Sequence, residues 1–496
     1  MKKWISALAV LAVVLSHTSP ARANAGPTRW GAYPTSSVLA VESDTPIQID
    51  SEDLVFDFTD NDDPVAREEL DAGWTLGGRV SATYDMSNPT NRFQRVQMAF
   101  PFVGNLASLG SQNITVEAGG KPVAFDIYPG SLIEISYDYS AFDETEENPA
   151  GDVFDFDKIV AEITDEPFTS EHFTKNEKGK LYTFTVTPTL GEDENINYAI
   201  DYTFDPERTN VVARGFNGFS RTGMDIRNTA WCRETTTLEL FVLGDDIEIL
   251  HSAYLDGEET EPTDAFTSFV SAQPMSVYTY AVEHLRSGPY IGREESSAGD
   301  ILALSDAQVY NAYAVILDRC FSRNAGYASD YDLSDARHTD RIITLVYSVD
   351  FPAGSSKSVS VSYNTYGSMD MRQTSKPMYT FDYILNPAGR WSAFKDLSIT
   401  VLPPKVVPFI IQSNVEFERQ QDGTYVTTLE ELPENDLRFT LYESAGISLG
   451  DRIKGSLFRS MGYLYPIVIG FGAVLAGFVI LVALLVRHRR KRKQAR

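Results

Sequence analysis

Apolar and polar residues alternate along much of the chain, which is the pattern of β-strands that bury one face. Residues 80–86 and 96–100 alternate on either side of the turn sequence SNPTN, and this predicts an antiparallel hairpin. Alternating runs recur in pairs at 182–186 and 198–204, at 343–349 and 359–363, and at 379–385 and 397–401. Repeated pairs of this kind predict the layers of a β-sandwich.

Three segments change to the helical spacing of apolar residues at i, i+3, i+4 and i+7. They lie near residues 156–163, 276–287 and 305–321. The third begins with Ser305 and has Gln308 three residues later, which is the sequence of a capping box. We therefore expect a mainly β fold with helical insertions that cover the faces or edges of its sheets.

Both ends of the chain carry patterns typical of an exported membrane protein. Residues 1–25 begin with lysines, continue with a short apolar run and end in small residues, as a secretory signal peptide does. Residues 464–486 form an uncharged apolar run, which predicts one C-terminal transmembrane helix. The Lys- and Arg-rich tail, 487–496, places the C-terminus in the cytoplasm by the positive-inside rule. We expect a single-pass protein of the cell membrane with an extracellular N-terminal part.

Acidic, turn-rich segments mark the expected boundaries between regions. The expected regions are a signal peptide (1–25), a first β region (26–141), a mixed α/β middle region (142–340), a second β region (341–403), a membrane-proximal segment (404–463), a transmembrane helix (464–486) and a basic cytoplasmic tail (487–496). The sequence leaves open whether the two β regions share one core.

Charge restricts the expected partners of the extracellular part. The formal net charge is −27, and many of the Lys and Arg residues lie in the two terminal segments. An acidic surface repels nucleic acid and anionic wall polymers unless cations bridge the two. The remaining expected partners are the membrane itself and an extracellular protein or cell-wall component.

The chain has two cysteines, Cys232 and Cys320. One disulfide between them is compatible with an oxidising compartment outside the cell. Cys320 falls on the apolar face of the third predicted helix, where a buried free thiol is equally natural. Both interpretations stay open.

Metal chemistry has weak signals in the sequence. The few histidines show no pair at the spacing of zinc ligands. Acidic clusters at 57–63 and 329–335 are interpreted as solvated loops, although hard oxygen donors of this kind also suit calcium. The first calcium candidates are Asp57, Asp60, Asp62 and Asp63, and no other cofactor is expected.

Two further stretches are candidates for a binding or a catalytic site. Arg390, Trp391 and Phe394 lie between two predicted strands, where they form either an exposed aromatic platform for a ligand or a plug at the end of the sandwich. The plug is favoured because the inner faces of the strands need a cover. Ser448 lies in GISLG, a match to the nucleophile elbow, but no triad Asp and His follow it outside the cytoplasmic tail.

Parts of the chain resemble a known family. SEDLVFDF (51–58), VSATYDMSNPTNRFQRVQMAFPF (80–102) and the aromatic stretch 379–404 resemble secreted bacterial proteins of the domain of unknown function 4424 type. The resemblance covers framework strands only, with the middle region and the membrane anchor as additions. It implies a bacterial β-rich framework and brings no activity.

The sequence therefore favours an extracellular binding or structural module of the bacterial cell surface, anchored in the membrane. One alternative is a cell-surface hydrolase that uses a pair of carboxylates, which motif patterns do not reveal. Another is an outer sensor that acts through a partner protein.

Overall fold

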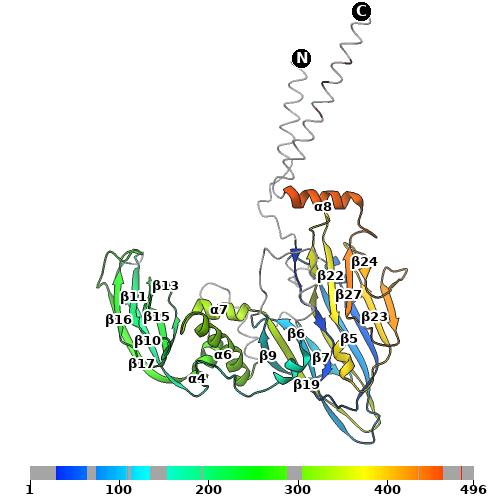
Figure 1. The fold of residues 1–496 in the computed structure, drawn as a ribbon, viewed down its shortest axis with the longest axis horizontal. Coiled ribbons are helices and arrows are strands. Elements are labelled where there is room, and N and C mark those ends of the chain that lie inside the picture. Colours follow the sequence, from blue (N-terminus) through cyan, green and yellow to red (C-terminus); the bar gives the residue numbers. More distant parts are fainter. Residues whose placement is uncertain are drawn as a thin grey trace, which may run out of the picture.

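The computed structural model describes residues 29–63, 74–107, 109, 113–133, 154–191, 194–287, 304–433 and 435–461, together with Gly477, Val482 and Arg487. Two β bodies lie at opposite ends of the molecule, with a group of helices between them (Figure 1). The mainly β class with helical insertions is thus confirmed. Among the residues described, no helix is both long and apolar enough to span a bilayer. The predicted signal peptide and nearly all of 464–486 lie outside the described residues.

The larger body is a sandwich whose first layer is an eight-stranded sheet. Its strands, in order, are β25 (Glu418–Arg419), β26 (Tyr425–Leu429), β23 (Leu397–Leu402), β4 (Gln48–Asp57), β5 (Gly77–Ser87), β20 (Ser356–Tyr366), β7 (Thr115–Ala118) and β8 (Lys121–Pro122). This sheet contains strands from both predicted β regions and from the membrane-proximal segment.

Two smaller sheets form the second layer of the large body. The four-stranded sheet has the order β3 (Leu39–Ala40), β6 (Gln94–Gly104), β19 (Arg341–Phe351) and β9 (Asp126–Leu132). The six-stranded sheet has the order β1 (Arg29–Trp30), β21 (Ser368–Asp370), β22 (Met378–Ile384), β27 (Leu437–Tyr442) and β24 (Phe409–Ser413), with β2 (Thr35–Ser36) beside β22. Aromatic contacts join the layers: Phe56 meets Phe439, and Phe100 meets Tyr363. One core therefore unites both β regions, which answers the question that the sequence left open.

The predicted hairpin at 80–100 is wrong. Strands β5 and β6 do not pair with each other: β5 pairs with β4 and β20, and β6 pairs with β19 and β3. The SNPTN turn carries the chain from one layer of the sandwich to the other. There Asn88 donates to the carbonyl oxygens of Phe351 and Pro352, which lie in the connection between β19 and β20. Alternation reports one buried face and cannot distinguish a hairpin from an arch between facing sheets.

The smaller body is a second sandwich built from the middle region. Its five-stranded sheet has the order β17 (Phe266–Ser276), β10 (Lys178–Pro188), β15 (Thr236–Gly244), β12 (Thr209–Arg214) and β18 (Tyr327–Ser329). Its four-stranded sheet has the order β13 (Gly218–Thr222), β14 (Asp225–Cys232), β11 (Ile196–Thr203) and β16 (Ile249–Tyr254). A separate apolar cluster fills the space between these two sheets.

The three predicted helices form, as α3 (Phe156–Ala161), α4 (Val277–Ser287) and α6 (Asp306–Arg323). Ser305 caps α6 by accepting from the Gln308 backbone, but the Gln308 side chain donates to the Thr164 carbonyl, so only half of the capping box forms. Helices α4 and α6 pack on the outer face of the five-stranded sheet, where the Phe241 and Tyr280 rings stack. They connect the small body to the large one (Figure 1).

Two helices were not predicted. The acidic stretch at 329–335, interpreted from the sequence as a loop, forms α7 (Asp330–His338) with a full capping box between Ser329 and Asp332. Helix α8 (Leu449–Met461) follows Ser448, whose hydroxyl accepts from the Asp451 backbone. The serine of the GISLG match is therefore a helix cap, which explains its position without any catalytic role.

Candidate functional site

The four calcium candidates do not converge. Asp57, at the end of β4, accepts hydrogen bonds from Thr59, and Asp62 forms an ion pair with Lys405 at 3.5 Å. Asp60 and Asp63 lie in and directly after the 3-10 helix η1 (Thr59–Asp62). Across the described part of the chain, no group of three or more His, Cys, Asp or Glu side chains is placed to hold a metal ion.

The Arg390–Phe394 stretch has the arrangement that the plug interpretation expects. Trp391 is 5% exposed, and its indole N–H donates to the Val38 carbonyl at 3.2 Å. Phe394 packs against the core of the large body, and Arg390 pairs with Asp157 of α3. A platform for a ligand needs exposed rings, so this stretch is not the site.

The two cysteines pack against different apolar clusters and are not joined by a disulfide. Cys232 is buried in the small sandwich, where burial raises its pKa. Cys320 lies on α6 and packs against the cluster that contains the helices. Of the two interpretations, the free thiol is the one that the structure has.

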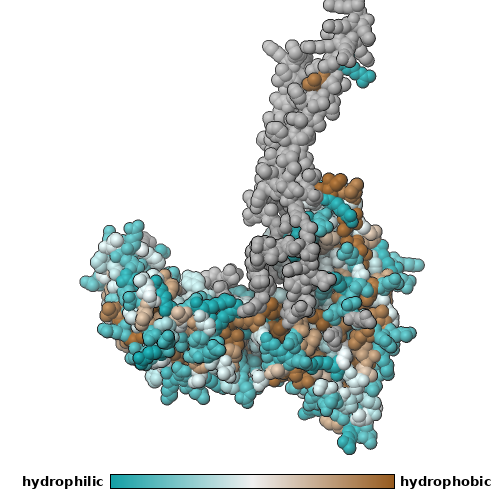
Figure 2. Space-filling view, viewed as in Figure 1, coloured by the Kyte–Doolittle hydropathy of each residue, from teal (hydrophilic) through white to brown (hydrophobic). Residues whose placement is uncertain are grey.

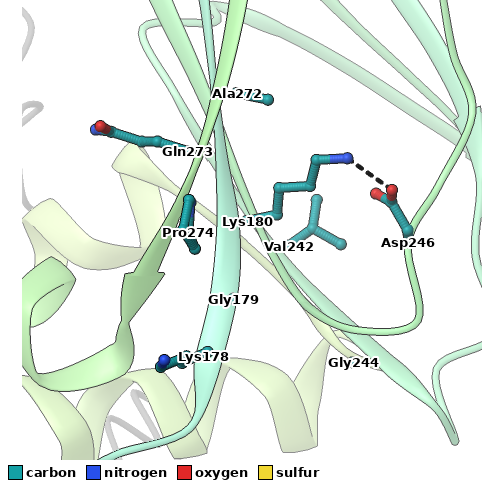
Figure 3. Close-up of a pocket in the computed structure, with 9 residues that line it drawn as sticks. All are labelled: Lys178, Gly179, Lys180, Val242, Gly244, Asp246, Ala272, Gln273 and Pro274. Atoms are coloured by element: carbon teal, nitrogen blue, oxygen red, sulfur yellow. Dashed lines mark hydrogen bonds and ion pairs between the residues drawn. The ribbon is translucent and has the colours of Figure 1, made fainter.

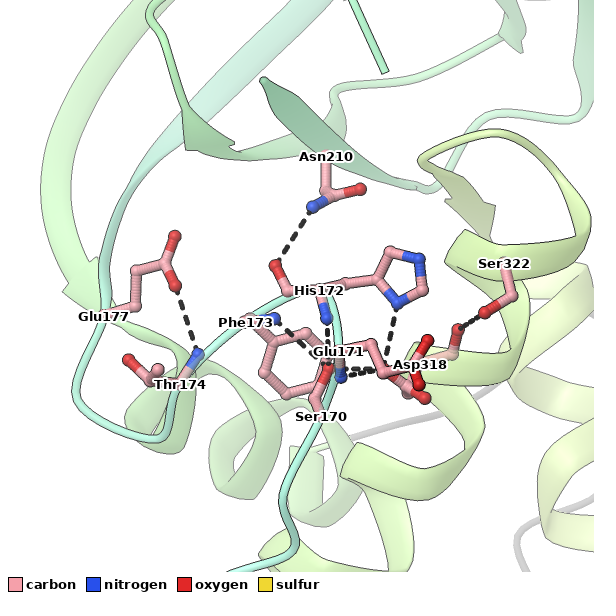
Figure 4. Close-up of polar contacts among 9 residues, drawn as sticks. All are labelled: Ser170, Glu171, His172, Phe173, Thr174, Glu177, Asn210, Asp318 and Ser322. Atoms are coloured by element: carbon pink, nitrogen blue, oxygen red, sulfur yellow. Dashed lines mark hydrogen bonds and ion pairs between the residues drawn. The ribbon is translucent and has the colours of Figure 1, made fainter. Parts of the chain in front are cut away.

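A Ser-His-Asp cluster, which the sequence gave no reason to single out, lies where the segment before β10 meets α6 (Figure 4). His172 Nδ1 lies 2.9 Å from Asp318 Oδ1, and Ser170 also donates to Asp318. A catalytic triad needs the serine bonded to the far nitrogen of the histidine, whereas here both groups contact the same carboxylate oxygen. Asp318 also accepts from the Glu171 backbone, so the cluster fastens this segment to the helix.

A shallow groove of about 380 Å³ runs over the ends of β10 and β17 (Figure 3). Its charges satisfy one another, because Lys180 Nζ lies 2.7 Å from Asp246, which also accepts from the Tyr182 hydroxyl. The hydrogen bond that Lys180 donates to Asp246 raises the pKa of Lys180. The rest of the lining is Gly179, Gly244, Val242, Ala272 and Pro274, with Lys178 and Gln273 as its other polar side chains, and it contains no aromatic ring.

A second cleft, of about 460 Å³, lies between α4 and the five-stranded sheet. His284 is 2% exposed and contacts the Tyr280 hydroxyl at 3.2 Å, while its other ring nitrogen lies 3.6 Å from Asp330. Arg214 and Glu239 form an ion pair at 3.2 Å. Burial raises the pKa of Asp330. The charged groups of this His284 cleft are thus arranged in pairs.

A third cleft, of about 260 Å³, lies in the large body between the β1–β2 segment, the end of β6 and the end of β20. Six aromatic side chains line it: Trp30, Tyr33, Phe100, Phe102, Tyr363 and Tyr366. Pockets that bind small molecules are concave and lined by aromatic groups with a few polar ones. We call it the aromatic cleft.

Two buried hydroxyls lie close together at the aromatic cleft. The Thr35 and Tyr363 hydroxyls both line it and interact with each other, but neither makes a hydrogen bond of normal geometry to a residue that the structure describes. Burying a hydroxyl without a hydrogen bond costs about 1–3 kcal/mol. These two groups therefore favour a bound molecule that hydrogen-bonds to them.

A buried polar network lies in the core of the large body. Glu52 of β4 is fully buried and accepts from the Tyr383 hydroxyl at 3.4 Å. Tyr383 in turn contacts Tyr84, which lies 3.0 Å from the Ser37 hydroxyl. Burial raises the pKa of Glu52 to about 8, so its carboxyl is mostly neutral at pH 7. The sequence signal was present, since Glu52 occupies an inward position of an alternating strand.

No protein-family profile and no curated protein matches the chain. Among solved structures, a chain described as a "putative nutrient binding protein" from Legionella pneumophila subsp. pneumophila str. Philadelphia 1 is similar, with 8% identity and a TM-score of 0.34. The match covers 88% of this chain and 76% of that one. A likeness at this level carries no functional argument, and the resemblance to the domain of unknown function 4424 type stays a prediction.

Proposed function

We propose that this chain is a small-molecule-binding module, exported and held at the outer face of a bacterial membrane, with the aromatic cleft as its ligand site. One observation carries the binding proposal: aromatic walls surround two buried hydroxyls that lie close to each other without a hydrogen bond of normal geometry among the described residues. Aromatic faces bind an apolar body, and unpaired hydroxyls fix its orientation.

Gly31 offers a way to test the cleft. It lies at the rim, and a Cβ built on it meets no atom within 4 Å, so a larger side chain there enters open space. We expect a screen of small metabolites against the full-length protein to find ligands that raise its Tm, and Gly31→Trp to weaken them at least tenfold. Gly389→Trp, at another glycine with open space around it, is the control.

Ligands that bind Gly31→Trp as well as the unmodified protein would place the site elsewhere. A screen in which no compound shifts the Tm of the full-length protein would remove the small-molecule proposal and leave binding of an extracellular protein or cell-wall component as the hypothesis.

The membrane part of the proposal is supported by the sequence pattern at 464–486 and by α8, which ends three residues before it. Leu449 is 74% and Ile453 52% exposed, one turn apart on the helix. Figure 2 shows hydrophobic atoms at the protruding end of this helix. Arg452 and Lys454 alternate with them and give α8 a basic character in an acidic protein. Such a helix suits the interface of an anionic bilayer.

Helix α8 is also fixed against the large body. Asp451 accepts from the Ser375 hydroxyl at 2.6 Å, and a Cβ on Gly455 would lie 2.5 Å from the Thr374 backbone nitrogen. This close approach requires glycine and sets the orientation of the large body relative to the helix. The expected topology is tested by tags at residue 26 and at the C-terminus, with protease added to intact cells. Loss of the first tag and protection of the second is expected; recovery of the protein in the soluble fraction would contradict anchoring.

The hydrolase alternative has one observation in its favour. Glu239, Glu283 and His284 all line the His284 cleft, where carboxylates and an imidazole meet in one concave site. Glu239, however, is already paired with Arg214, and His284 with Tyr280 and Asp330. Hydrolysis of a glycoside or ester substrate that disappears in Glu283→Gln would establish this alternative.

A further inference from the structure

We propose that two copies of this chain associate through strand β17, which pairs edge to edge with the β17 of the second copy and joins two sheets into one. This inference is independent of the aromatic cleft and assigns a partner to a different part of the molecule. It is carried by the length, the exposure and the lack of charge of this edge strand.

Strand β17 is the outermost strand of the five-stranded sheet. Its eleven residues pair with β10 and with no other described strand. Figure 1 shows β17 on the side of the small body that lies away from the large one. Residues 269–274 are all exposed, with Phe269 at 69% and Val270 at 42%. A long exposed edge of this kind is a template for pairing with another strand.

The other sheet edges among the described residues are short or irregular, as natural proteins keep them. Strands β1, β3, β8 and β25 have two residues each, and β18 has three. Strands β13 and β16 have five and six residues, and the pairing of β9 and β24 contains register shifts. Strand β17 pairs without a shift, and residues 265–276 carry no charge in a protein with a net charge of −27. It therefore lacks the features that keep an edge unpaired.

The outward side of β17 carries backbone groups at alternate residues. The Thr189 N–H donates to the Ala265 carbonyl, which makes Ala265 a hydrogen-bonded position of the ladder with β10, and a second bond of the same parity closes the other end. Hydrogen-bonded positions alternate along an antiparallel ladder. The even-numbered residues of 266–276 therefore direct their backbone groups away from β10. Pro274, which has no N–H, belongs to this outward row and costs the sheet no hydrogen bond.

The sequence of β17 fits a second copy of itself. In a two-fold antiparallel pairing centred on Phe269, this residue lies opposite the Phe269 of the second copy. That is a non-hydrogen-bonded position, where facing side chains come closest and aromatic pairs stabilise a sheet. Ser268 then lies opposite Val270, and Phe266 opposite Ala272, which gives about eight hydrogen bonds between the two copies.

The distribution of charge favours the same arrangement. An acidic protein repels its own copies over most of its surface, whereas two uncharged strands bring no like charges together. The register centred on Phe269 also places Asp264 of one copy opposite Pro274 of the other, near Lys178, an exposed residue of β10. Opposite charges therefore flank the uncharged strands at both ends of the pairing.

Cysteine crosslinking of the full-length protein tests the register. Phe269→Cys brings two thiols to a position where the Cα atoms are about 4.5 Å apart, which a disulfide can span. Ser271→Cys, on the same face of β17, leaves its two copies roughly 13 Å apart and is the control. We expect mild oxidation to link Phe269→Cys into dimers on a non-reducing gel, but not Ser271→Cys or the unmodified protein. Equal linking of the two variants, or no linking of Phe269→Cys, would overturn the inference.

Sedimentation of the full-length protein in detergent measures the association itself. We expect a dimer whose dissociation constant rises at least tenfold in Val270→Pro, with little change in Tm, because the N–H that is lost points away from β10. Val270→Thr, which keeps the N–H and the shape of the side chain, is the control. A protein that stays monomeric at every concentration, or a dimer that Val270→Pro leaves unchanged, would overturn the inference. A monomer that holds a different protein and loses it in Val270→Pro would assign this edge to a foreign strand and overturn the pairing of two copies.

Discussion

The aromatic cleft and the His284 cleft differ in how their polar side chains are paired. In the His284 cleft, Arg214 pairs with Glu239, and His284 contacts Tyr280 and lies 3.6 Å from Asp330 Oδ1, which makes no hydrogen bond of its own. At the aromatic cleft, the buried Thr35 and Tyr363 hydroxyls make no hydrogen bond of normal geometry to a described residue. Polar groups that satisfy one another stabilise a fold, whereas unsatisfied ones destabilise it unless a ligand binds. The ion pair between Arg214 and Glu239 has no counterpart at the aromatic cleft, which is why we propose the aromatic cleft as the ligand site.

The largest effect expected from this comparison concerns Glu52. Its pKa is about 8 in the folded protein against 4.5 for the free group, so between these values the folded state holds more protons than the unfolded state. Stability therefore falls as pH rises from about 4.5 to 8. Glu52→Gln removes this fall and is expected to make the protein about 4 kcal/mol more stable than the unmodified protein at pH 8.5.

Denaturant unfolding at pH 5 and pH 8.5 measures this effect. Asp53→Asn, at the exposed neighbouring position of β4, is the control and is expected to keep the pH dependence. If Glu52→Gln were as sensitive to pH as the unmodified protein, the carboxyl would not be buried in neutral form.

The second expected effect concerns Asp330, beside the His284 cleft. Substitution here lowers the free energy of unfolding, whereas Glu52→Gln raises it. Asp330 accepts from the Gly215 backbone at 2.6 Å and lies 3.6 Å from His284. Asp330→Ala leaves the Gly215 N–H without its acceptor and removes the carboxyl beside His284, and is expected to cost about 2–3 kcal/mol of unfolding free energy. Asp330→Asn keeps an acceptor for Gly215 and should cost less. Equal losses in both variants, measured in urea, would show that the hydrogen bond to Gly215 contributes nothing.

The sequence predicted the elements of the large body well but not their pairing. Alternation at 80–86 and 96–100 gave both strands, because each buries one face, yet it contains no information about which layer a neighbour joins. The polar stretch of α7 has too few apolar residues to show helical periodicity, and its capping box was the signal that could have revealed it. The aromatic cleft was missed because its walls come from segments far apart in the chain, such as Trp30, Phe102 and Tyr363.

The smallest expected effect tests whether the hydrogen bonds of the partly exposed Ser170–His172–Asp318 cluster stabilise the protein. Burial alone would raise the pKa of Asp318, but hydrogen bonds from Ser170 and His172 outweigh it and lower the pKa below the usual 3.8. The ionised Asp318 carboxylate therefore stabilises the protein at pH values above the pKa that Asp318 has in the unfolded state. This stabilisation is lost as the pH falls through the lower pKa of the folded state, which is the opposite pH dependence to that of Glu52. Asp318→Asn is expected to cost about 1 kcal/mol at pH 7, and progressively less as the pH falls through the lowered pKa of the native carboxyl. Thermal unfolding of this variant beside Glu171→Gln, an exposed neighbour in the same segment, measures the loss. A loss that stays constant between pH 7 and 2.5 would mean that the carboxylate charge has no part in holding the segment to α6.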